Sequence, residues 1–572
     1  MKSYSISSDL PLDVENELKE FPELVRRLLY NRGISKIDDA KIFLNPDYER
    51  DLHDPFLILD MEKAVQRILR AIQNDEKIII YGDYDADGIP GSVVLHDFFK
   101  KINYSNFENY IPHRYREGYS LNHGAIEKFA EGGVTLVVTV DSGITDVEEV
   151  KKANELGVDI IITDHHLPLV GEDGQQIIPP AYAVLNSKQD NCDYHFDMLC
   201  GAGTAFKLVQ ALIKKGEFNI AKGWEKWLLD VVGISTIADM VPLKGENRAL
   251  AYYGLKVLRK SPRPGLIKLL KKTGVKQRFL TEEDVGFTIA PRINAASRMG
   301  EPIDAFRLLS TEDEVLAGQL SDDLDHLNNK RKGLVASIIK EARKKLEAKE
   351  EVREVIVMGN TLWMPGLLGL AANKLMEEYG RPVFMWGKEG GEIIKGSCRS
   401  NGGVNVVDLM SSTPANTFLE LGGHESAGGF SVSSEKIHIL EDMLVEAYKK
   451  LEQKSHDRKI PVDKKMNLDE VNIGTYGLIE SLAPYGIENP KPIFLFEGIE
   501  IAQVLHFGKE KNHLKLVFKN SSGYSVPAIG FFMTSDDHER IKEGNSINLV
   551  ASMEKSTFGR TNEIRLRIVD MI

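Results

Sequence analysis

Cysteine is scarce in this sequence of 572 residues, which contains only Cys192, Cys200 and Cys398 and no Cys-x-x-Cys pair. A dense disulfide framework and an ordinary cysteine zinc site are therefore excluded. Long hydrophobic runs are also missing, since no apolar stretch approaches the roughly 20 residues that cross a bilayer. The N-terminus lacks the basic and then apolar pattern of a secretory signal. These absences predict a cytoplasmic protein with no membrane partner.

Positive charge is in deficit, because 72 Lys and Arg stand against 85 Asp and Glu, for a formal net charge of −13. This balance argues against a protein that coats nucleic acid through bulk positive charge, although it is compatible with a local basic groove. The proportions of hydrophobic (42%), charged (27%) and aromatic (8%) residues are those of a globular protein. The length predicts about three or four domains.

Three short apolar runs end in side chains of the kind that bind metals. Residues 77–82 lead into Asp83, residues 134–140 into Asp141, and residues 158–163 into Asp164-His165-His166. The runs alternate with helical patterns, which predicts a parallel sheet wrapped by helices. Because the carboxyl ends of parallel strands share one edge, we expect these side chains to meet in one crevice.

The first of these runs is followed by Asp83, Asp85 and Asp87 at alternate positions, and then by Gly88. Like charges in one pocket raise each other's pKa values and destabilise the fold unless cations neutralise them. A calcium EF-hand loop is the competing interpretation. It fails because Val94 stands at the twelfth position, where a bidentate Glu is required, and because a strand precedes the loop. A metal site is therefore favoured over a solvated acidic turn.

The other strand ends extend this ligand set. Alone, Asp141 and Asp164 could be turn or helix-cap residues, and the adjacent histidines could be exposed. Together, carboxylate and imidazole ligands favour Mn²⁺ or Mg²⁺. Neighbouring side chains on an extended segment point to opposite sides, so we expect His165 to be a ligand and His166 to face the substrate. Asp239, after a further apolar stretch, is either another ligand or a helix-terminal carboxylate.

The rest of the chain predicts further units. Residues 311–350 form a long amphipathic connecting helix, and a second α/β segment follows with two glycine-rich loops, at 396–400 and 422–429. After a lysine-rich linker, short alternating strands predict a small β-barrel. The expected domains are an N-terminal helical segment (1–45), a parallel-sheet domain (46–310), the connecting helix (311–350), a second α/β domain (351–455) and the barrel (456–572).

The motifs Asp83-Tyr-Asp-Ala-Asp-Gly88, Val140-Asp-Ser-Gly143, Asp164-His-His166 and Ile237-Ala-Asp-Met-Val-Pro242 resemble, in this order, those of the DHH phosphoesterases. Other segments narrow the resemblance to RecJ exonucleases: 112–119, 201–203, 245–248, 291–298, 422–424 and 484–490. The resemblance covers residues 77 to the C-terminus. It implies an α/β fold with a parallel-sheet DHH catalytic domain, a long connecting helix, a second DHH-associated α/β domain for substrate binding, and a C-terminal OB-type barrel that binds nucleic acid.

The activity that this resemblance implies is that of a metal-dependent exodeoxyribonuclease. It would degrade single-stranded DNA from the 5′ end by a two-metal mechanism, with two Mn²⁺ or Mg²⁺ ions, in DNA repair and recombination. A single-stranded-DNA-binding protein and a recombination helicase are candidate partners, and a monomer is expected. Two alternatives remain: a DHH phosphoesterase for short oligonucleotides or small nucleotides, and a non-catalytic DNA-binding scaffold.

The resemblance also implies roles for individual residues. The metal ligands are Asp85, Asp87, Asp141, His165 and Asp239, with Asp83 as a further ligand or a water holder. The catalytic residues are His166, Asp164, Asp83, Arg292 and Arg298, although an arginine could be only an ion-pair partner. The substrate-binding residues are Arg114, Tyr119, Asn294, Ser297, Arg298, Ser397, Arg399, Gly422, Gly423 and His424.

Several positions depart from the family pattern, namely Pro90, Ser120, Ser297, Cys398 and Met364. None of them removes a metal ligand. In the barrel, one or two phenylalanines could stack on bases, while most are expected in the core; the candidates are Phe494, Phe496, Phe507, Phe518 and Phe531. A basic cluster either lines the DNA path or is a solvated face, and it comprises Lys271, Lys272, Lys276 and Arg278.

Overall fold

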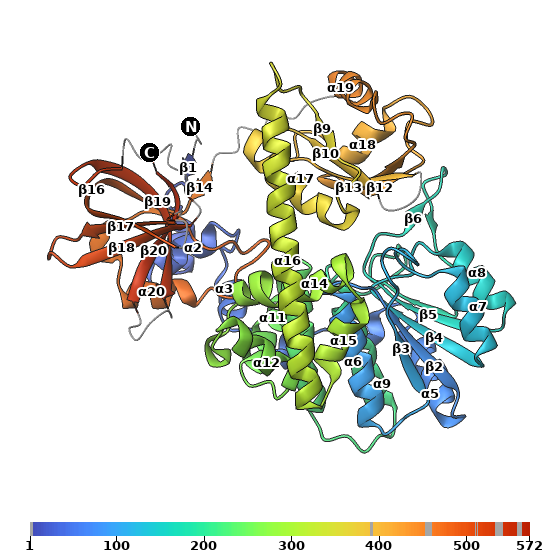
Figure 1. Ribbon diagram of the computed structural model, residues 1–572. Coiled ribbons are helices and arrows are strands. Elements are labelled where there is room, and N and C mark those ends of the chain that lie inside the picture. The colour runs from blue at the N-terminus through green and yellow to red at the C-terminus, as the bar shows by residue number, and fades with distance from the viewer. Residues whose placement is uncertain are drawn as a thin grey trace.

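The computed structural model describes residues 4–388, 393–451, 460–508, 511, 513–531, 533, 541–556 and 563–571. Figure 1 shows two α/β domains beside the long helix α16 (Glu314–Glu347) and a barrel on the other side of it. This architecture confirms the predicted fold class. No helix in the described ranges is long and apolar enough to cross a membrane.

The first domain is built on a parallel sheet in the order β3-β2-β4-β5-β8. Its strands are β2 (Lys77–Gly82), β3 (Phe107–Tyr110), β4 (Val134–Val140), β5 (Asp159–Thr163) and β8 (Ala183–Leu185). The central strands are apolar on both faces, as in sheets covered by helices on both sides. A short hairpin, β6 (Leu169–Val170) and β7 (Gln176–Ile177), follows β5.

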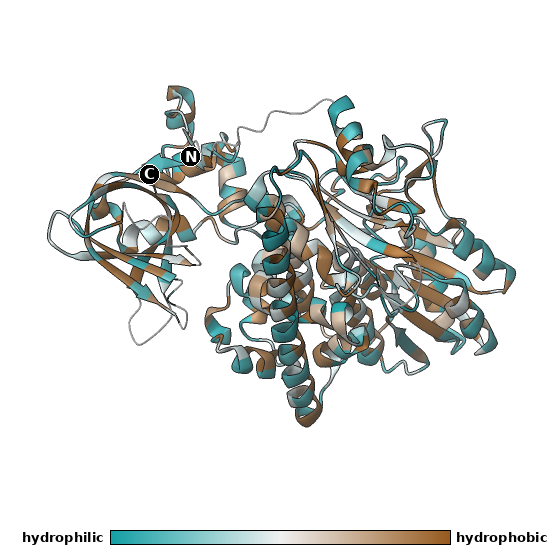
Figure 2. Cartoon of the chain, turned by 45° about the horizontal axis from the view of Figure 1, so that its top comes forward, coloured by the Kyte–Doolittle hydropathy of each residue, from teal (hydrophilic) through white to brown (hydrophobic). Residues whose placement is uncertain are grey.

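Helices cover both faces of this sheet. One core contains side chains of α5 (Met61–Gln73), α6 (Gly88–Lys101) and α9 (Gly201–Lys215). The opposite core contains side chains of α7 (His123–Glu131) and α8 (Val147–Glu155). Figure 2 shows the hydrophobic colouring concentrated on the strands between these helices. The sheet is thereby doubly wound, and its carboxyl edge is open to the rest of the molecule.

A helical part extends the first domain and leads into α16. It contains η2 (Trp224–Leu228), α10 (Leu229–Ala238), α11 (Gly245–Leu258), α12 (Pro264–Thr273), η3 (Gln277–Phe279), α13 (Glu282–Asp284), the π-helical turn η4 (Val285–Ile289), α14 (Ala290–Met299) and α15 (Pro302–Ser310). The N-terminal half of α16 packs on α12, α14 and α15, and its C-terminal half packs on the second domain. This helix therefore sets the spacing of the two α/β domains.

The second domain has a mixed sheet in the order β12-β13-β11-β10-β9. Its strands are β9 (Ile356–Gly359), β10 (Val383–Lys388), β11 (Ile394–Arg399), β12 (Glu420–His424) and β13 (Ala427–Val432). Its helices are α17 (Pro365–Tyr379), α18 (Val406–Ser411) and α19 (Leu440–Lys450). β12 is an exposed edge strand, and it brings a glycine-rich backbone to the surface.

The barrel is a largely antiparallel sheet that closes on itself where β16 pairs with β19. Its strands are β15 (Lys464–Lys465), β16 (Phe494–Phe507), β17 (His513–Lys519), β18 (Ser525–Phe531), β19 (Ser546–Ser556) and β20 (Glu563–Met571), with η5 (Leu468–Glu470) and α20 (Ile473–Glu480) before β16. Within it, β18 and β20 pair in parallel.

The N-terminal segment packs on the barrel although the two lie at opposite ends of the sequence. It comprises β1 (Tyr4–Ile6), α1 (Leu12–Glu17), α2 (Glu23–Tyr30) and α3 (Ile37–Leu44), and then α4 (Tyr48–Asp51) and η1 (Pro55–Leu57) lead to the first domain. Leu18, Leu28 and Leu29 share one core with the barrel strands. β1 also pairs in parallel with β14 (Ile460–Val462). The barrel therefore contacts the first domain in part through this segment.

Candidate functional site

The strand ends of the first sheet place three aspartates in a row. Backbone hydrogen bonds continue one residue past each strand, from Asp83 N–H to Val140 O (3.1 Å), from Asp141 N–H to Thr163 O (2.9 Å) and from Asp164 N–H to Leu185 O (3.1 Å). All three aspartates are buried. The sheet itself thus aligns side chains that come from distant parts of the sequence.

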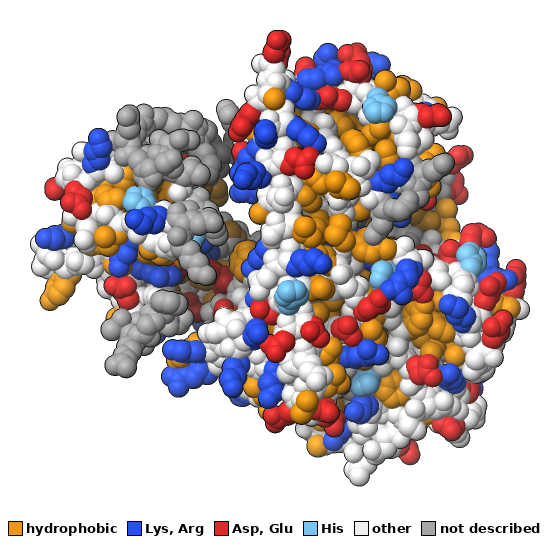
Figure 3. All heavy atoms as spheres, viewed as in Figure 1, with side chains coloured by type: hydrophobic (Ala, Val, Ile, Leu, Met, Phe, Trp, Pro, Cys, Tyr) orange, Lys and Arg blue, Asp and Glu red, His pale blue; other side chains and the backbone are white. Residues whose placement is uncertain are grey.

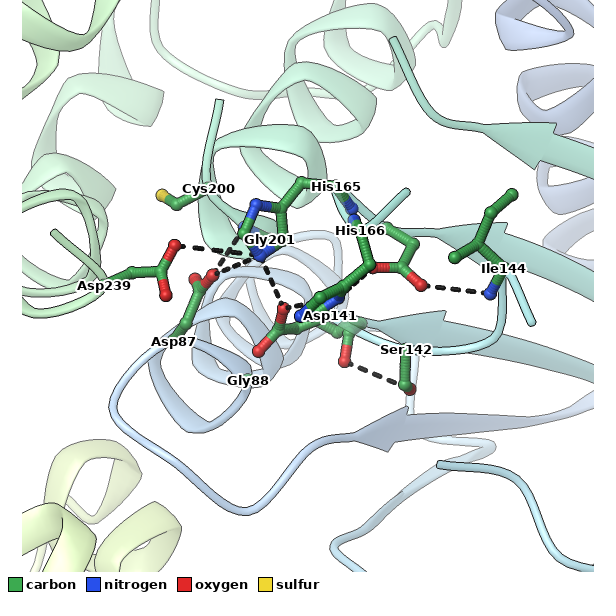
Figure 4. Close-up of polar contacts among 12 residues, drawn as sticks. Asp87, Gly88, Asp141, Ser142, Ile144, His165, His166, Cys200, Gly201 and Asp239 are labelled. Carbon is green, nitrogen blue, oxygen red and sulfur yellow. Dashed lines mark hydrogen bonds and ion pairs between the residues drawn. The ribbon is translucent and has the colours of Figure 1, made fainter. Parts of the chain in front are cut away.

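His165 lies at the centre of the first cluster of ligand atoms. Its Nε2 is 3.1 Å from Asp141 Oδ1, 3.5 Å from Asp87 Oδ2 and 3.7 Å from Asp239 Oδ2. Figure 4 shows these carboxylates converging on the imidazole from separate elements, with Asp239 arriving from the end of α10. One candidate metal-binding group accordingly consists of Asp87, His165 and Asp239, whose ligand atoms lie within 4.8 Å of one another.

A second group lies directly beside the first. Asp83, Asp85 and Asp141 offer oxygens within 4.8 Å of one another, and Asp141 also forms a group with His165 and His166. Asp141 therefore belongs to one cluster and contacts the other through His165. The structure brings together every residue that the sequence nominated as a metal ligand.

The electrostatics of these clusters suit cations. Burial and the neighbouring carboxylates raise the pKa values of Asp83 and Asp141 well above their ordinary range, and they raise that of Asp239 to about 9. Asp83 Oδ1 and Asp141 Oδ1 are buried and accept no hydrogen bond from any described residue. Buried carboxylate oxygens without donors are costly. Divalent cations would satisfy both the oxygens and the accumulated charge.

Backbone groups hold the acidic loop in place. The carboxylate of Asp87 accepts from the N–H of Gly201 (2.6 Å) and of Ala202 (2.8 Å), at the N-terminus of α9, and from Ser235 Oγ. A Cβ at Gly201 would lie 2.5 Å from Asp141 Cβ, so this close approach requires glycine. The loop also donates from Ala86 N–H to Asn294 Oδ1 at 3.0 Å. Asn294 therefore supports the acidic loop from α14.

Two residues of the turn after β4 have a positive φ. Asp141 has a φ of 62°, in the left-handed region that non-glycine residues rarely occupy. Such conformations concentrate where the surrounding structure enforces them for function. Gly143, two residues later, has a φ of 112°. The turn after β4 thus directs the carboxylate of Asp141 toward His165 instead of along the sheet.

The prediction that His165 and His166 point to opposite sides is wrong. Their ring centroids are 4.5 Å apart, because the segment after β5 is irregular and does not continue the strand. The two histidines nevertheless have different partners. His166 Nδ1 lies 2.8 Å from Asp164 Oδ1 and 3.4 Å from the hydroxyl of Tyr119.

Asp164 orients His166 and lies outside the groups of metal-binding atoms in the described structure. Its carboxylate also accepts from Ile144 N–H (3.0 Å). Burial alone would raise its pKa, but the hydrogen bonds from His166 and the backbone lower it. Burial lowers the pKa of His166, yet the bond to Asp164 outweighs this and raises it. Burial lowers the pKa of His165, which favours the neutral imidazole that a metal ligand requires.

A cavity of about 410 Å³ lies between the two α/β domains. The first domain contributes Tyr84, Arg114 and Tyr119 to its wall, and the second contributes Lys395, Ser397 and Gly422 among others. The guanidinium of Arg114 lies 5.1 Å from the ring centroid of Tyr84. Four residues nominated for substrate binding thus share one pocket, namely Arg114, Tyr119, Ser397 and Gly422.

Other nominated residues lie near this pocket without lining it. Gly423 has a φ of 142°, and a Cβ there would approach Ala427 O to 2.4 Å. His424 ends the exposed strand β12. Arg399 donates to the carbonyl of Cys398 at 2.7 Å, and its guanidinium packs against Gly369. In the sequence these residues directly follow Gly422 or lie two positions after Ser397, which line the pocket.

The arginines of α14 have protein partners. Arg292 forms an ion pair with Asp325 of α16 (Nη2–Oδ1 2.7 Å) and also donates to Thr288 O. Arg298 donates from Nη1 to Gly366 O at 2.8 Å, and burial lowers its pKa to about 10. Its Nε has no acceptor among the described residues. Arg292 therefore fits the ion-pair alternative, whereas Arg298 retains a free donor.

The departures from the family pattern leave the metal clusters intact. Pro90 lies in the first turn of α6, where proline is tolerated, and Met364 precedes α17. Ser297 is buried and donates to Asn294 O at 3.1 Å. Two further residues hold the clusters: Ser235 donates to Asp87, and Lys188 Nζ donates to His165 O at 2.5 Å. Neither residue has a distinctive sequence pattern, so only the fold identifies them.

Comparisons with known proteins agree with this geometry. The DHH family N-terminal domain matches residues 77–236, the DHHA1 domain matches residues 353–454, and the RecJ OB domain matches residues 462–570. A parallel sheet with this acidic edge, a DHHA1 domain and an OB barrel define the chain as a multidomain member of the DHH class.

Relatives narrow that class. The single-stranded-DNA-specific exonuclease RecJ of Bacillus subtilis is 36% identical, over 96% of this chain and 67% of its own length. The protein of the same name from Haemophilus influenzae is 32% identical, over 84% of this chain and 85% of its own length. The crystal structure of Thermus thermophilus RecJ in complex with Mn²⁺ superposes with a TM-score of 0.81 at 26% identity, covering 100% of this chain and 79% of that one. The chain belongs to the RecJ family.

Proposed function

We propose that this chain is a metal-dependent exonuclease that hydrolyses the phosphodiester bonds of single-stranded DNA from the 5′ end. The observation that carries the proposal is the pair of ligand clusters at the sheet edge, which meet at Asp141. The relatives from Bacillus subtilis and Haemophilus influenzae are named as single-stranded-DNA-specific exonucleases, which supports the substrate class. The fold supports the same class through the OB barrel.

Two divalent ions, Mn²⁺ or Mg²⁺, fit the clusters. In this proposal Asp87, His165 and Asp239 hold one ion, and Asp83, Asp85 and Asp141 hold the other. Oxygen and imidazole donors suit both metals, and the RecJ structure from Thermus thermophilus contains Mn²⁺. When bound, such a pair supplies Lewis-acid charge for phosphoryl transfer and favours the deprotonation of water.

The protein's own groups then position the scissile phosphate. The Nδ1–H of His166 donates to Asp164, and this bond raises the pKa of His166 and so favours the protonated imidazole, whose Nε2–H can donate to a phosphate oxygen. The hydroxyl of Tyr119 lies near both His166 Nδ1 and Asp141 O, at 3.4 Å from each, and joins the interdomain pocket to the metal clusters. Arg298 Nε, without an acceptor, is a second candidate donor to the strand.

The interdomain cavity is suited to the 5′ end of the strand. Arg114 and Lys395 supply positive charge, and Ser397 and the backbone near Gly422 supply donors without bulky side chains. A pocket that receives a terminal phosphate beside the metal clusters would impose 5′ polarity. Figure 3 shows acidic and basic side chains interspersed over the visible face, so binding would depend on this local pocket more than on a broad basic surface.

The cellular assignment extends the same proposal. A role in DNA repair and recombination, in the cytoplasm and as a monomer, fits a single-strand exonuclease. A single-stranded-DNA-binding protein and a recombination helicase are the partners that such an enzyme would meet on its substrate.

Digestion of end-labelled DNA tests the proposal. Strands labelled at the 5′ or the 3′ end are incubated with Mn²⁺, with or without a chelator, beside a duplex of the same sequence. Early release of the 5′ label from single strands alone, abolished by the chelator, is the expected result. Early release of the 3′ label would overturn the polarity, and binding without hydrolysis would favour the scaffold alternative.

A truncation separates long from short substrates. Removing residues beyond 458 deletes the barrel, which the small-nucleotide alternative does not need. The N-terminal segment, which packs on the barrel, is deleted as well. We expect the truncated protein to hydrolyse short oligonucleotides and to lose the preference for long strands. Unchanged degradation of long strands would favour a small-substrate phosphoesterase.

A further inference from the structure

The side chain of Arg248 lies where three parts of the chain meet. It projects from α11 of the first domain and is only 3% exposed. Its Nε donates to Phe43 O at 2.7 Å, and its Nη2 donates to Leu482 O at 3.0 Å and to Ala483 O at 3.2 Å. Its guanidinium also lies 3.6 Å from the ring centroid of Phe43. One side chain thus ties the first domain to the N-terminal segment and to the segment that enters the barrel.

The described hydrogen-bond partners of this guanidinium are backbone carbonyls, which carry no net charge. Burial lowers the pKa of Arg248 to about 10, which reflects the cost of placing its charge there. An apolar side chain of similar volume would avoid burying a charge, but it would leave the carbonyls of Phe43, Leu482 and Ala483 without this donor. The directional hydrogen bonds of Arg248 therefore fix the relative position of the three segments.

A second set of contacts fixes the same place. Leu243 N–H donates to Ile487 O at 2.9 Å, and Lys244 forms an ion pair with Glu488. A Cβ at Gly486 would lie 2.7 Å from Leu243 Cδ1, so the two segments touch. The name docking joint is used below for these contacts between Phe43, Leu243, Lys244, Arg248 and residues 482–490.

Residues 482–490 are internally braced. Asn489 is fully buried, and its amide donates to Leu482 O and Pro484 O at 2.8 Å each. Its Oδ1 accepts from Arg32 Nε of the N-terminal segment at 2.6 Å. Residues 482–490 are therefore held in one conformation, and their contacts fix the barrel relative to the first domain.

The segment that carries Leu243, Lys244 and Arg248 begins at the metal clusters. Asp239 follows α10, with Oδ2 3.7 Å from His165 Nε2, and Met240 takes a left-handed φ of 60° before the chain reaches Leu243. Asn247 braces this turn, because its amide donates to Pro242 O at 3.1 Å. Only a short segment separates a candidate metal ligand from the docking joint.

We propose that Arg248 is a positioning residue that, through the docking joint, holds the barrel at a fixed place relative to the metal clusters. A strand engaged on the barrel is then delivered to the clusters in one orientation. This inference rests on the proposed function, since it assumes that the barrel binds the strand. It gives a role to two sequence motifs, Gly245–Arg248 and Pro484–Pro490, that the chemistry at the metal clusters leaves unexplained.

Substitution of Arg248 tests the proposal, because a loss of positioning should raise KM and leave kcat nearly unchanged. Arg248→Met keeps the apolar stem and removes the donors. We expect it to raise the KM for a strand of about 40 nucleotides roughly tenfold, with kcat changed less than about twofold. Hydrolysis of a trinucleotide, which in this proposal depends on the metal clusters and not on the barrel, should be unchanged. Arg248→Lys, which can still donate to carbonyls, should recover part of the loss.

Arg259→Met is the matched control. Arg259 ends the same helix and also donates to a backbone carbonyl, Leu280 O at 2.8 Å, but within the first domain. Its loss should leave the ratio of long-strand to trinucleotide KM unchanged. Equal losses on both substrates for Arg248→Met, with a lowered melting temperature, would reduce Arg248 to a structural residue and overturn the proposal.

A surface variant tests the joint without disturbing the buried guanidinium. Lys244 and Glu488 are half-exposed, at 51% and 43% of their side-chain areas. Lys244→Glu should raise the long-strand KM about threefold, and combining it with Glu488→Lys should restore the KM. A failure of the double variant to restore it would count against the joint.

The wild-type protein tells an error in the proposed function of the barrel from an error in the docking joint. If it hydrolyses long strands and trinucleotides with the same KM, the proposed role of the barrel is wrong. If it prefers long strands and Arg248→Met keeps that preference, the function stands and only the docking joint is wrong.

Discussion

The metal clusters and the interdomain pocket lack opposite kinds of hydrogen-bond partner. At the sheet edge, the buried oxygens Asp83 Oδ1 and Asp141 Oδ1 accept no hydrogen bond from the described residues, whereas beside the pocket Arg298 Nε donates none to them. Acceptors without donors suit cations, and donors without acceptors suit phosphates. This difference fits the proposed function, in which the metal clusters carry out the reaction and the pocket holds the strand. Substitutions in the first should therefore change kcat, and substitutions in the second should change KM.

Asp141→Asn gives the strongest test of the comparison. It removes one charge where the two clusters meet but keeps the size of the side chain. We expect kcat to fall on the order of 10³-fold or more, because one cluster loses a charged ligand and the other loses the carboxylate that contacts His165. In the presence of a chelator the variant should melt at a higher temperature than the wild type, since it relieves like-charge repulsion.

The control for this variant is Asp193→Asn, an exposed carboxylate of the first domain outside the clusters. It should retain normal activity and normal melting. The measurements are kcat and the melting temperature of both variants. If Asp141→Asn keeps most of its activity, the metal clusters are not the site of the reaction.

Removal of metal should expose the charge of the clusters as a pH dependence of stability. The pKa of Asp239 is raised to about 9 in the folded protein, far above its value of about 3.9 in an unfolded chain. Between these values the folded state binds more protons, so the free energy of unfolding falls as the pH rises from about 4 to about 9. Thermal melts in chelator should follow this slope.

Mn²⁺ should reverse the slope, because cations replace the protons at the clusters as the pH rises. Asp239→Asn should flatten the slope in chelator, whereas the same substitution at the exposed Asp193 should not. Parallel slopes with and without Mn²⁺ would mean that the carboxylates are not a cation site.

The sequence predicts the metal clusters better than the pocket for a physical reason. Asp83, Asp141 and Asp164 follow strands of one parallel sheet, and the hydrogen bonds of that sheet fix their neighbourhood. The relative direction of His165 and His166 depends on an irregular segment, which side-chain alternation cannot describe. Likewise, Arg292 pairs with Asp325 on another helix, a contact that helix packing creates and that spacing does not reveal.

In the barrel, too, the sequence does not predict which side chains are exposed. Phe494, Phe496 and Phe518 are fully buried, while Phe507 is 36% exposed. The strand β16 has register irregularities between Phe496 and Ile499 and between Ile501 and Gln503. Each one interrupts the alternation of inward and outward side chains. A sequence pattern therefore identifies the candidates for base stacking without telling which of them reach the surface.

Arg114→Gln sharpens the comparison from the side of the pocket. Since the guanidinium supplies charge to the cavity, we expect the KM for a 5′-phosphorylated strand to rise about tenfold with little change in kcat. A strand with a 5′ hydroxyl should be affected much less. Arg116→Gln is the matched control, because Arg116 lies two residues away on the same segment but pairs with Glu301 at the surface. Equal effects of Arg114→Gln on both strands would exclude contact with the terminal phosphate.

The smallest expected effect lies on the barrel, far from both sites. The rings of Phe507, His513 and Phe531 form a cluster with centroids 5.1 to 6.1 Å apart, and the Arg567 guanidinium lies 4.0 Å from the centroid of Phe531. Partly exposed aromatic and guanidinium groups of this kind are suited to stacking on bases. Phe507→Ala should raise the KM for a strand of about 40 nucleotides about fivefold and leave trinucleotide hydrolysis unchanged. Tyr524→Ala, which removes an aromatic ring that is 74% exposed at another place on the barrel, should have no effect. If both variants behave alike, binding of the strand to the barrel does not depend on this cluster. The division between a site for the reaction and a site for strand binding would then apply only to the metal clusters and the interdomain pocket.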